Sequence, residues 1–405
     1  MTTLVIFLLT YAGVALGRIP GLMLDRTGIA LLGAIALVAS GIVPLNEAVA
    51  AIDLPTILLL YALMVVSAQL RLGGFYTWVA FRSSRLTARP EVLLAAVMGL
   101  AAALSALLAN DIICLAFTPV LCATLLAAGR RPLPYLLGLA AASNIGSAAT
   151  IIGNPQNMLI GQVGHLDFGA FLRWCAPPSL LALLAAYGLI CWTYRATLQE
   201  RTAATPTAQA AEWPEFNRWQ SSKGLLATGL LVLLFFTPLP RELSAITVAG
   251  ILLCSRRMHS RQILELVDWH LITLFCALFI VIHAINAQGL PARIIDTLAA
   301  HGINPTHLFT LAGVSTLMSN LVSNVPAVML LMRFINPLQP AQWYTLAVSS
   351  TFAGNLVVIG SIANLIVIEQ ARPFGVIISF RDHARIGVPV TLCSLLILGG
   401  WLVLQ

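Results

Sequence analysis

Long apolar stretches recur along the whole chain, and short polar loops separate them. A helix needs about 20 mostly apolar residues to cross a hydrocarbon core of roughly 30 Å. In the first half of the chain the stretches cover 3–16, 28–43, 54–72, 92–128, 134–164 and 171–194. After a polar linker the same order begins again, at 224–239, 243–254, 269–287, 306–332, 343–371 and 386–404. The pattern predicts an all-α polytopic membrane protein built from two related halves.

Individual residues support an internal repeat. Corresponding residues of the two halves lie 207 to 215 positions apart, and the pairs are Asp53/Asp268, Asn110/Asn324, Gly153/Gly360 and Asn157/Asn364. Internal repeats of this kind are typical of transporter folds. We expect a first repeat over 1–196, a cytoplasmic linker over 197–222 and a second repeat over 223–405.

Four of the apolar stretches are interrupted near their middles by polar residues, glycine or proline. The stretch 306–332 has 27 residues, which is too many for one crossing and too few for two. It fits a re-entrant hairpin with its tip at 323–326, and 92–128 is interpreted in the same way. Each half then has five crossings, a re-entrant hairpin and a broken helix. Five is odd, so the second half enters from the opposite side and the repeats are inverted.

The basic residues test this topology, because they played no part in deriving it. With the amino terminus on side A, only four of the 22 Lys and Arg residues fall on side A: Arg173, Arg241, Arg293 and Arg333. The other eighteen fall on side B: Arg18, Arg26, Arg71, Arg82, Arg85, Arg89, Arg130, Arg131, Arg195, Arg201, Arg218, Lys223, Arg256, Arg257, Arg261, Arg372, Arg381 and Arg385. Positive residues favour the cytoplasm, so we expect side B, including the linker from Arg195 to Lys223, to be cytoplasmic. Both termini of this inner-membrane protein would then lie outside.

Composition agrees with a lipid environment. The chain is 59% hydrophobic and only 9% charged, which is too little polar surface for a soluble protein of 405 residues. Its net charge of +7 is spread over the loops, so nucleic acid is not an expected partner. The sequence has no HExxH, no Walker A motif and no CxxC. We expect neither an enzyme nor a cofactor other than a coupling sodium ion.

The breaks are the predicted site. Unpaired backbone groups are costly inside a membrane, and a common reason to keep them is ligand binding. Four helix N-termini would converge at mid-membrane and favour an anion, while helix C-terminal carbonyls at the same depth could coordinate sodium. Uncharged polar side chains gather at these breaks, namely Asn110, Ser143, Asn144, Thr150, Asn154, Asn157, Ser323, Asn324, Asn355, Ser361 and Asn364. The alternative is that each of them only caps a helix end.

Asp111 is the acidic residue that falls deep within an apolar stretch, and Val325 stands at the corresponding position of the second half. An intramembrane carboxylate is a functional candidate, either as a sodium ligand or as a proton carrier. We expect a sodium ion near Asn110, Asp111 and Asn157. The alternative for Asp111 is a structural carboxylate held by the N–H groups of the hairpin. His283, in the stretch 269–287, is interpreted as an ordinary hydrogen-bonded histidine.

At these motifs the chain resembles the ion transporter superfamily, which includes NhaD-type antiporters, ArsB-type arsenite pumps, citrate transporters and divalent anion/sodium symporters. The resemblance covers the full length, and four segments carry it: LLANDIICLAFTPVL at 107–121, NIGSAATIIGNPQN at 144–157, LVSNVPAVMLL at 321–331 and GNLVVIGSIANLI at 354–366. It implies a homodimer with a scaffold and a moving transport subdomain that works as an elevator. By resemblance the binding positions are Asn110, Asp111, Asn324, Gly153, Asn154, Pro155, Asn157, Gly360 and Asn364.

The hairpin tips differ from those of the divalent anion symporters, which carry Ser-Asn-Thr. This chain has Ala-Asn-Asp at 109–111 and Ser-Asn-Val at 323–325. We therefore interpret it as a secondary transporter of a small inorganic or carboxylate anion, coupled to Na⁺ or H⁺. Sodium/proton antiport and arsenite or antimonite efflux remain as alternatives.

Overall fold

The computed structural model describes residues 2–17, 21–84, 86, 88–201, 215–255, 258–289 and 307–405, and all regular elements in these ranges are helices. Those of the first half are α1 (Thr2–Leu16), α2 (Arg26–Ala39), α3 (Leu45–Ala51), α4 (Leu54–Leu72), α5 (Phe75–Ser84), α6 (Pro90–Leu107), α7 (Asn110–Ala127), α8 (Leu133–Ser147), α9 (Pro155–Val163), α10 (Phe168–Thr193) and α11 (Arg195–Gln199).

The second half follows the same order. Its helices are α12 (Arg218–Phe235), α13 (Arg241–Leu253), α14 (Ser260–Leu264), α15 (Trp269–Asn286), α17 (Leu308–Val322), α18 (Asn324–Leu331), α19 (Pro340–Ala353), α20 (Ile362–Ala371) and α21 (Phe380–Leu404), with 3₁₀ turns η1 (Met332–Phe334), η2 (Val358–Gly360) and η3 (Arg372–Phe374). The predicted Arg18, Arg85, Arg256, Arg257 and Arg293, and residues 202–214 of the linker, lie outside the described residues.

Six described helices are long and apolar enough to cross a membrane: α4, α6, α7, α10, α15 and α21. Shorter apolar helices accompany them, among them α1, α2 and α17. An all-helical polytopic membrane fold is therefore confirmed. Both α6 and α7 have 18 residues, so each arm of the first predicted hairpin is about 27 Å long.

Asp53 and Asp268, which the predicted repeat pairs with each other, both act as helix N-caps. The Asp53 carboxylate accepts a hydrogen bond from the backbone N–H of Thr56 at 2.9 Å, and Asp268 accepts one from Leu271 at 2.9 Å. Each therefore caps the N-terminus of the helix that it precedes, α4 or α15. An N-cap carboxylate also interacts favourably with the positive end of the helix dipole.

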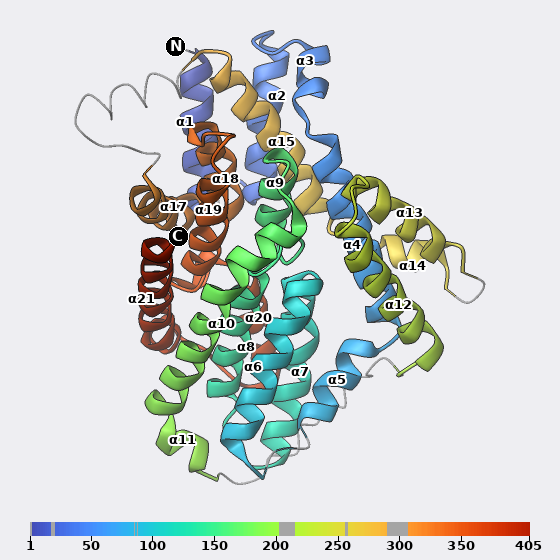
Figure 1. Cartoon of the computed structure of the whole chain (residues 1–405), viewed down its shortest axis with the longest axis vertical. Helices are drawn as coiled ribbons and strands as arrows, with labels where there is room; N and C mark the ends of the chain where they lie inside the picture. The colour runs from blue at the N-terminus through green and yellow to red at the C-terminus, as the bar shows by residue number, and fades with distance from the viewer. Residues whose placement is uncertain are drawn as a thin grey trace.

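The two halves pack across each other. Helix α4 lies against α13 of the second half, and its counterpart α15 lies against α2 of the first half. In Figure 1, α1, α2, α3 and α15 gather at the upper end, α6, α7 and α8 form the lower part, and α12, α13 and α14 lie to one side. Helices α8 and α19 occupy the interior, since nearly every residue of each is buried. The two halves are thus not separate domains.

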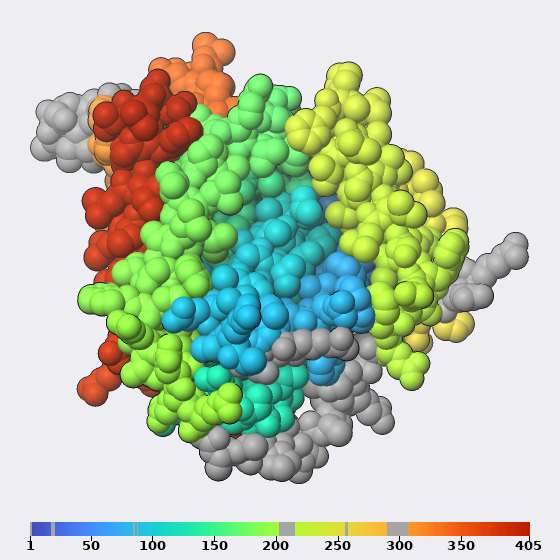
Figure 2. Space-filling view, turned by 60° about the horizontal axis from the view of Figure 1, so that its bottom comes forward, coloured from blue at the N-terminus to red at the C-terminus, as the bar shows by residue number. Residues whose placement is uncertain are grey.

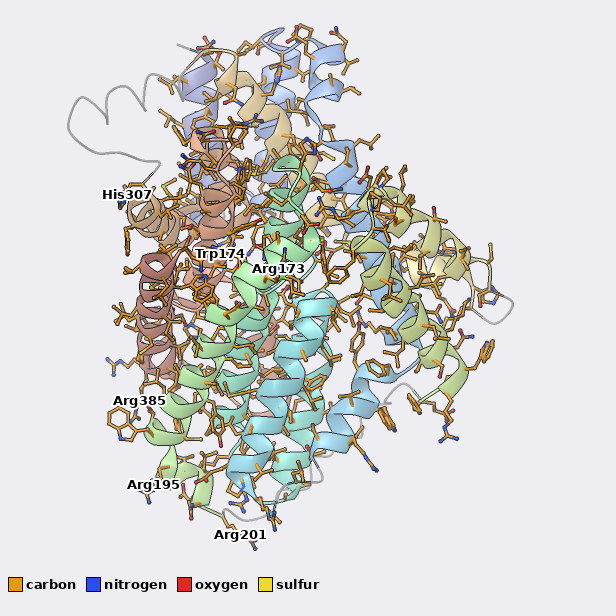
Figure 3. The ribbon with its side chains drawn as sticks, in the orientation of Figure 1. Arg173, Trp174, Arg195, Arg201, His307 and Arg385 are labelled. Carbon is orange, nitrogen blue, oxygen red and sulfur yellow. The ribbon has the colours of Figure 1, made fainter. Side chains whose placement is uncertain are left out.

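Helix α10 lies on the surface between α21 and α6 (Figure 2). Its two ends carry arginines that the predicted topology assigns to opposite sides of the membrane. Arg173 is near the upper end of α10, whereas Arg195 lies just beyond its lower end, together with Arg385 of α21 (Figure 3). Arg385 stacks over the ring of Tyr194 at 5.6 Å.

Candidate functional site

The helix breaks lie where the sequence predicts them. Helix α6 ends at Leu107 and α7 begins at Asn110, while α17 ends at Val322 and α18 begins at Asn324. The other two breaks separate α8 from α9 and α19 from α20. Four helices, α7, α9, α18 and α20, therefore start inside the molecule.

The two broken helices use the same hydrogen bonds. The amide N–H₂ of Asn157 donates to the carbonyls of Ser147, at 3.2 Å, and Thr150, at 3.0 Å. These acceptors lie ten and seven residues earlier. The amide of Asn364 donates to acceptors at the same two spacings, Gly354 at 2.9 Å and Val357 at 3.3 Å. Carbonyls released by the breaks are thus paired by a side chain of the following helix, which is what a buried backbone requires.

Helix caps occupy both breaks. The Asn154 side chain accepts a hydrogen bond from the Asn157 N–H at 2.9 Å and caps α9. Ser361 accepts one from the Ala363 N–H at 3.2 Å and caps α20. These two residues therefore cap helix ends, and both also line the cavity described below.

A polar network joins the two halves at the breaks. The Asn144 amide donates to the side-chain oxygens of Asn355, at 2.8 Å, and Asn364, at 3.3 Å. Its own oxygen accepts a hydrogen bond from the Ser361 hydroxyl at 2.8 Å. Asn144 is in α8, whereas the three partners belong to the second half, so this network fixes one broken helix against the other.

Hydroxyl groups attach the first hairpin to α8 and to the break that follows it. Ser143 donates to the carbonyl of Asn110 at 3.1 Å and lies 3.0 Å from the hydroxyl of Ser105 in α6. Thr150 donates to the carbonyl of Ala106, close to the end of α6. Thr150 thus positions the hairpin, because its hydroxyl is hydrogen-bonded to the backbone of α6.

All four helix N-termini meet at one small cavity of about 40 Å³. Its lining includes Asn110 and Asp111 of α7, Asn154 and Pro155 at the start of α9, Ser323 and Asn324 at the start of α18, and Gly360 and Ser361 at the start of α20, together with Asn144. The predicted convergence of N-termini is thus present in the structure. Asp111 is the one ionisable residue in the described lining and it is acidic, so the positive potential there comes from the four helix dipoles.

A larger cavity of about 180 Å³ adjoins the small one. The two share Asn110, Asp111, Pro155 and Leu271. The larger cavity is also lined by Arg71 of α4 and by Asp268, the N-cap of α15. From the sequence, Arg71 is predicted only as one of the basic residues of side B, and Asp268 only as the counterpart of Asp53 in the repeat. Their meeting with Asp111 depends on the packing of helices far apart in the chain, which no local sequence pattern indicates.

Several polar atoms at the site have no protein partner. The side-chain oxygens of Asn110, Asn157 and Asn324 are buried and accept no hydrogen bond. Asp111 likewise has no hydrogen bond to any described residue. Asn110 is only 6% exposed, so its oxygen cannot rely on bulk water. Uncharged and anionic oxygens are the ligands that Na⁺ binds. Asn110 and Asp111 line both cavities whereas Asn157 lines neither, and the sodium position near these three residues stays a prediction. A group of three or more His, Cys, Asp or Glu side chains that could hold a metal is absent from the described ranges.

Close backbone contacts explain the glycine in the first break. A Cβ atom on Gly153 would lie 2.2 Å from the carbonyl oxygen of Ser147, and on Gly360 it would lie 3.0 Å from the side-chain oxygen of Asn320. Ser323, at the tip of the second hairpin, has φ 75° and ψ 158°, a conformation that is normally restricted to glycine. The backbone at this tip is therefore strained.

The predicted site residues divide into two groups. Those that line the small cavity are Asn110, Asp111, Asn144, Asn154, Pro155, Ser323, Asn324, Gly360 and Ser361. Those that lie around it are Thr150, Gly153, Asn157, Asn355 and Asn364. His283 is outside both groups, and its ring lies 3.6 Å from the carboxylate of Glu47.

Comparison with known proteins finds a matching family and relatives that are similar over nearly the whole chain. Residues 5–353 match the model of a family described as citrate transporter. A 46 kDa membrane protein of Mycobacterium leprae is 30% identical over 99% of this chain and 97% of its own length. The silicon efflux transporter LSI3 of Oryza sativa subsp. japonica is 30% identical, over 92% of this chain and 91% of its own length.

A solved structure has the same general fold. The crystal structure of the Alcanivorax borkumensis YdaH transporter aligns with 99% of this chain and 95% of its own, with a TM-score of 0.53 and 16% sequence identity. At this identity the likeness concerns the fold alone.

Proposed function

This chain belongs to the citrate transporter family of membrane transporters, and on that basis we propose that it is a cation-coupled secondary transporter of a small inorganic or carboxylate anion. The observation that carries the proposal is the meeting of four helix N-termini at one buried cavity that also contains Asp111. Helix N-termini stabilise negative charge, and a low local dielectric strengthens that effect.

Asp111 gives the coupling its physical basis. Its carboxylate faces the same cavity as the proposed anion, and two negative charges at close range repel each other strongly in a low dielectric. A sodium ion held by Asp111 and by the free oxygens of Asn110 and Asn157, or a proton on Asp111, removes that repulsion. Anion binding then requires the cation, and this requirement is the origin of coupled transport.

Transport into proteoliposomes tests the proposal. The purified protein is reconstituted, and uptake of radiolabelled citrate and phosphate is measured with an imposed Na⁺ gradient, an imposed proton gradient, or neither. We expect uptake of at least one of these anions, stimulated by one of the gradients. Anion uptake at the same rate with and without either gradient would refute coupling. Uptake of neither anion would refute the choice of these substrates.

Efflux of a metalloid hydroxide is the second candidate. Arsenite and antimonite are uncharged hydroxides near neutral pH, and the described lining of the small cavity contains no Lys, Arg or His to balance an anion. The similarity to a silicon efflux transporter also favours it. Growth on arsenite of an arsenite-sensitive host, with and without the gene, distinguishes this candidate: resistance supports it, and unchanged sensitivity opposes it.

Sodium/proton antiport is the third candidate, because Asp111 has no hydrogen-bond partner among the described residues. A pH-sensitive dye inside liposomes reports antiport directly, and a sodium-driven pH change without any anion in the buffer would favour it. For all three candidates we propose an inner-membrane homodimer with both termini outside, in which a transport subdomain moves as an elevator.

A further inference from the structure

Two cavities that each have an arginine in their lining lie at different places between α4, α15 and the helices of the breaks. The first, of about 180 Å³, is lined by Arg71 and Asp268. The second, of about 340 Å³, is lined by Arg333 and Asp53. Asp53 and Asp268 are the corresponding N-caps of α4 and α15. Each cavity therefore combines one of the repeat-related aspartates with one arginine.

The arginine of the first cavity has unused hydrogen-bonding capacity. Arg71 is half-buried in the last turn of α4, and none of the described residues accepts a hydrogen bond from it. No carboxylate in the described ranges comes within 4.0 Å of it, Asp268 included. One Asp268 oxygen is instead used by the Leu271 N–H. A guanidinium offers five N–H donors in a fork that matches the oxygens of a carboxylate or phosphate.

The arginine of the second cavity is likewise unpaired among the described residues. Arg333 is in η1, directly after α18, and it too has no hydrogen bond or ion pair with the described part of the chain. Asp53, on the same cavity, is occupied in part by the Thr56 N–H. Arg333 is exposed, whereas Arg71 is half-buried.

Only one of the two cavities adjoins the site in this conformation. The Arg71 cavity shares Asn110, Asp111, Pro155 and Leu271 with the small cavity, whereas the Arg333 cavity shares no lining residue with it. In the predicted topology Arg71 belongs to the cytoplasmic side and Arg333 to the outer side. The conformation described here thus has its site next to the cavity on the predicted cytoplasmic side.

We propose that Arg71 and Arg333 are the anion-capturing residues of two opposite entrances, one on each side of the membrane. This inference rests on the proposed function, since it requires an anionic substrate with two or more oxygens on one centre. Each guanidinium binds the anion at its entrance and passes it to the small cavity, where helix N-termini and the coupling cation replace the arginine. The nearby aspartate keeps the arginine from holding the anion too tightly, because it lowers the local positive potential.

The alternative is a purely structural role. Both arginines lie at the C-terminal end of a helical segment, where a positive charge interacts favourably with the dipole. A structural role predicts that replacement lowers stability and leaves substrate affinity equal on the two sides. Capture at an entrance instead predicts an effect that depends on the side from which the anion arrives.

The test compares Arg71→Gln and Arg333→Gln in right-side-out and inside-out membrane vesicles, with radiolabelled citrate or phosphate, whichever the wild type carries. We expect Arg71→Gln to raise KM about 10- to 100-fold for entry from the cytoplasmic face only, which is the range for losing a charge-assisted hydrogen bond. Arg333→Gln should do the same from the outer face only, so each variant is the matched control of the other. Arg71→Lys, which keeps the charge without the fork, should fall between wild type and Arg71→Gln.

The outcomes distinguish a failure of the capture role from a failure of the choice of substrates. Unchanged KM from both faces, or an equal rise from both, overturns the capture role while the transporter function stands. A wild type that carries neither anion refutes citrate and phosphate as substrates, and with them the capture of these anions by Arg71 and Arg333. Thermal melting of each variant in detergent shows whether it is folded, and Arg71→Lys provides a second reading if Arg71→Gln does not accumulate.

Discussion

Asp111 stands in an unusual position for a carboxylate, because it faces the cavity where four helix N-termini meet and has no hydrogen bond to the described residues. We expect Asp111→Asn to reduce coupled uptake to the level of protein-free liposomes, since the amide has the same shape but can neither carry a proton nor attract Na⁺. Gradient-driven uptake measures this. Asp111→Glu, which keeps the charge, is the control and should retain part of the activity.

A structural Asp111 would behave differently. In that case Asp111→Asn would lower the melting temperature and leave the rate per folded molecule near that of the wild type. Measuring the melting temperature alongside uptake therefore distinguishes a coupling carboxylate from one that merely supports the hairpin.

A second prediction concerns the close packing around Gly153. A methyl group there would lie 2.2 Å from the Ser147 carbonyl oxygen, a backbone atom that cannot move without disturbing the break. We expect Gly153→Ala to destabilise the protein by about 2 to 3 kcal/mol, as overpacking does in a tight core. Thermal melting in detergent reports the change.

Gly99→Ala is the matched control for Gly153→Ala. Gly99 is in α6, and a Cβ atom there would have no neighbour within 4 Å. Alanine favours a helix over glycine by about 1 kcal/mol, so this variant should melt at the same temperature as the wild type or higher. Equal losses of stability in the two variants would contradict the steric explanation.

The polar side chains at the helix breaks could be predicted from the sequence, but not all of their roles could. Asn110, Asp111 and Asn324 could be predicted because polar residues stand out within apolar stretches. Asn144, by contrast, forms three hydrogen bonds to the second half, and no local sequence pattern indicates partners more than 200 residues away. Arg71 was missed as a cavity residue for the same reason, since the cavity is completed by α7, α9 and α15.

At the element scale, the tip of the second hairpin stores strain. Ser323 has a φ of 75° with an extended ψ, which costs about 1 to 3 kcal/mol for a residue other than glycine. We expect Ser323→Gly to be more stable than Ser323→Ala, because both lose the hydroxyl and only the glycine relieves the backbone. The melting temperatures of the two variants measure this difference.

The comparison of glycine with alanine also separates the hydroxyl from the backbone. If the hydroxyl of Ser323 binds the substrate or its cation, both variants should transport poorly, because neither has it. If they melt at the same temperature, the strained conformation of the tip is not present in the protein in solution.

The helix breaks were predictable from the sequence, but the lengths of the hairpin arms were not. The arms α17 and α18 have 15 and 8 residues, whereas α6 and α7 have 18 each. Both α6 and α7 are long and apolar enough to cross a membrane, so the first tract departs from the predicted short re-entrant hairpin. The parity of the topology is unaffected, since a tract that crosses twice adds an even number to the five crossings of its half.

At the scale of the whole molecule, the sequence predicted two halves but not how they pack. Helix α4 packs on α13, α15 packs on α2, and the Asn144 network crosses between the halves, so neither half has a complete core of its own. Such contacts depend on shape complementarity between distant helices, which hydrophobic periodicity does not encode. The order of the long apolar helices, in contrast, follows directly from the alternation of apolar and polar stretches, whereas the short helices α3, α5, α11 and α14 lie outside the predicted stretches.

The orientation in the membrane is the last prediction, and the two ends of α10 provide its test. Arg173 and Arg195 are both exposed and lie at opposite ends of this 26-residue helix. If the side that carries most of the basic residues is cytoplasmic, Arg173→Cys should react with a membrane-impermeant thiol reagent in intact cells, whereas Arg195→Cys should react only after permeabilisation. Both changes are made in a Cys254→Ser background, because Cys254 is exposed. The reverse labelling pattern would invert the topology, and with it the assignment of the Arg71 cavity to the cytoplasmic face.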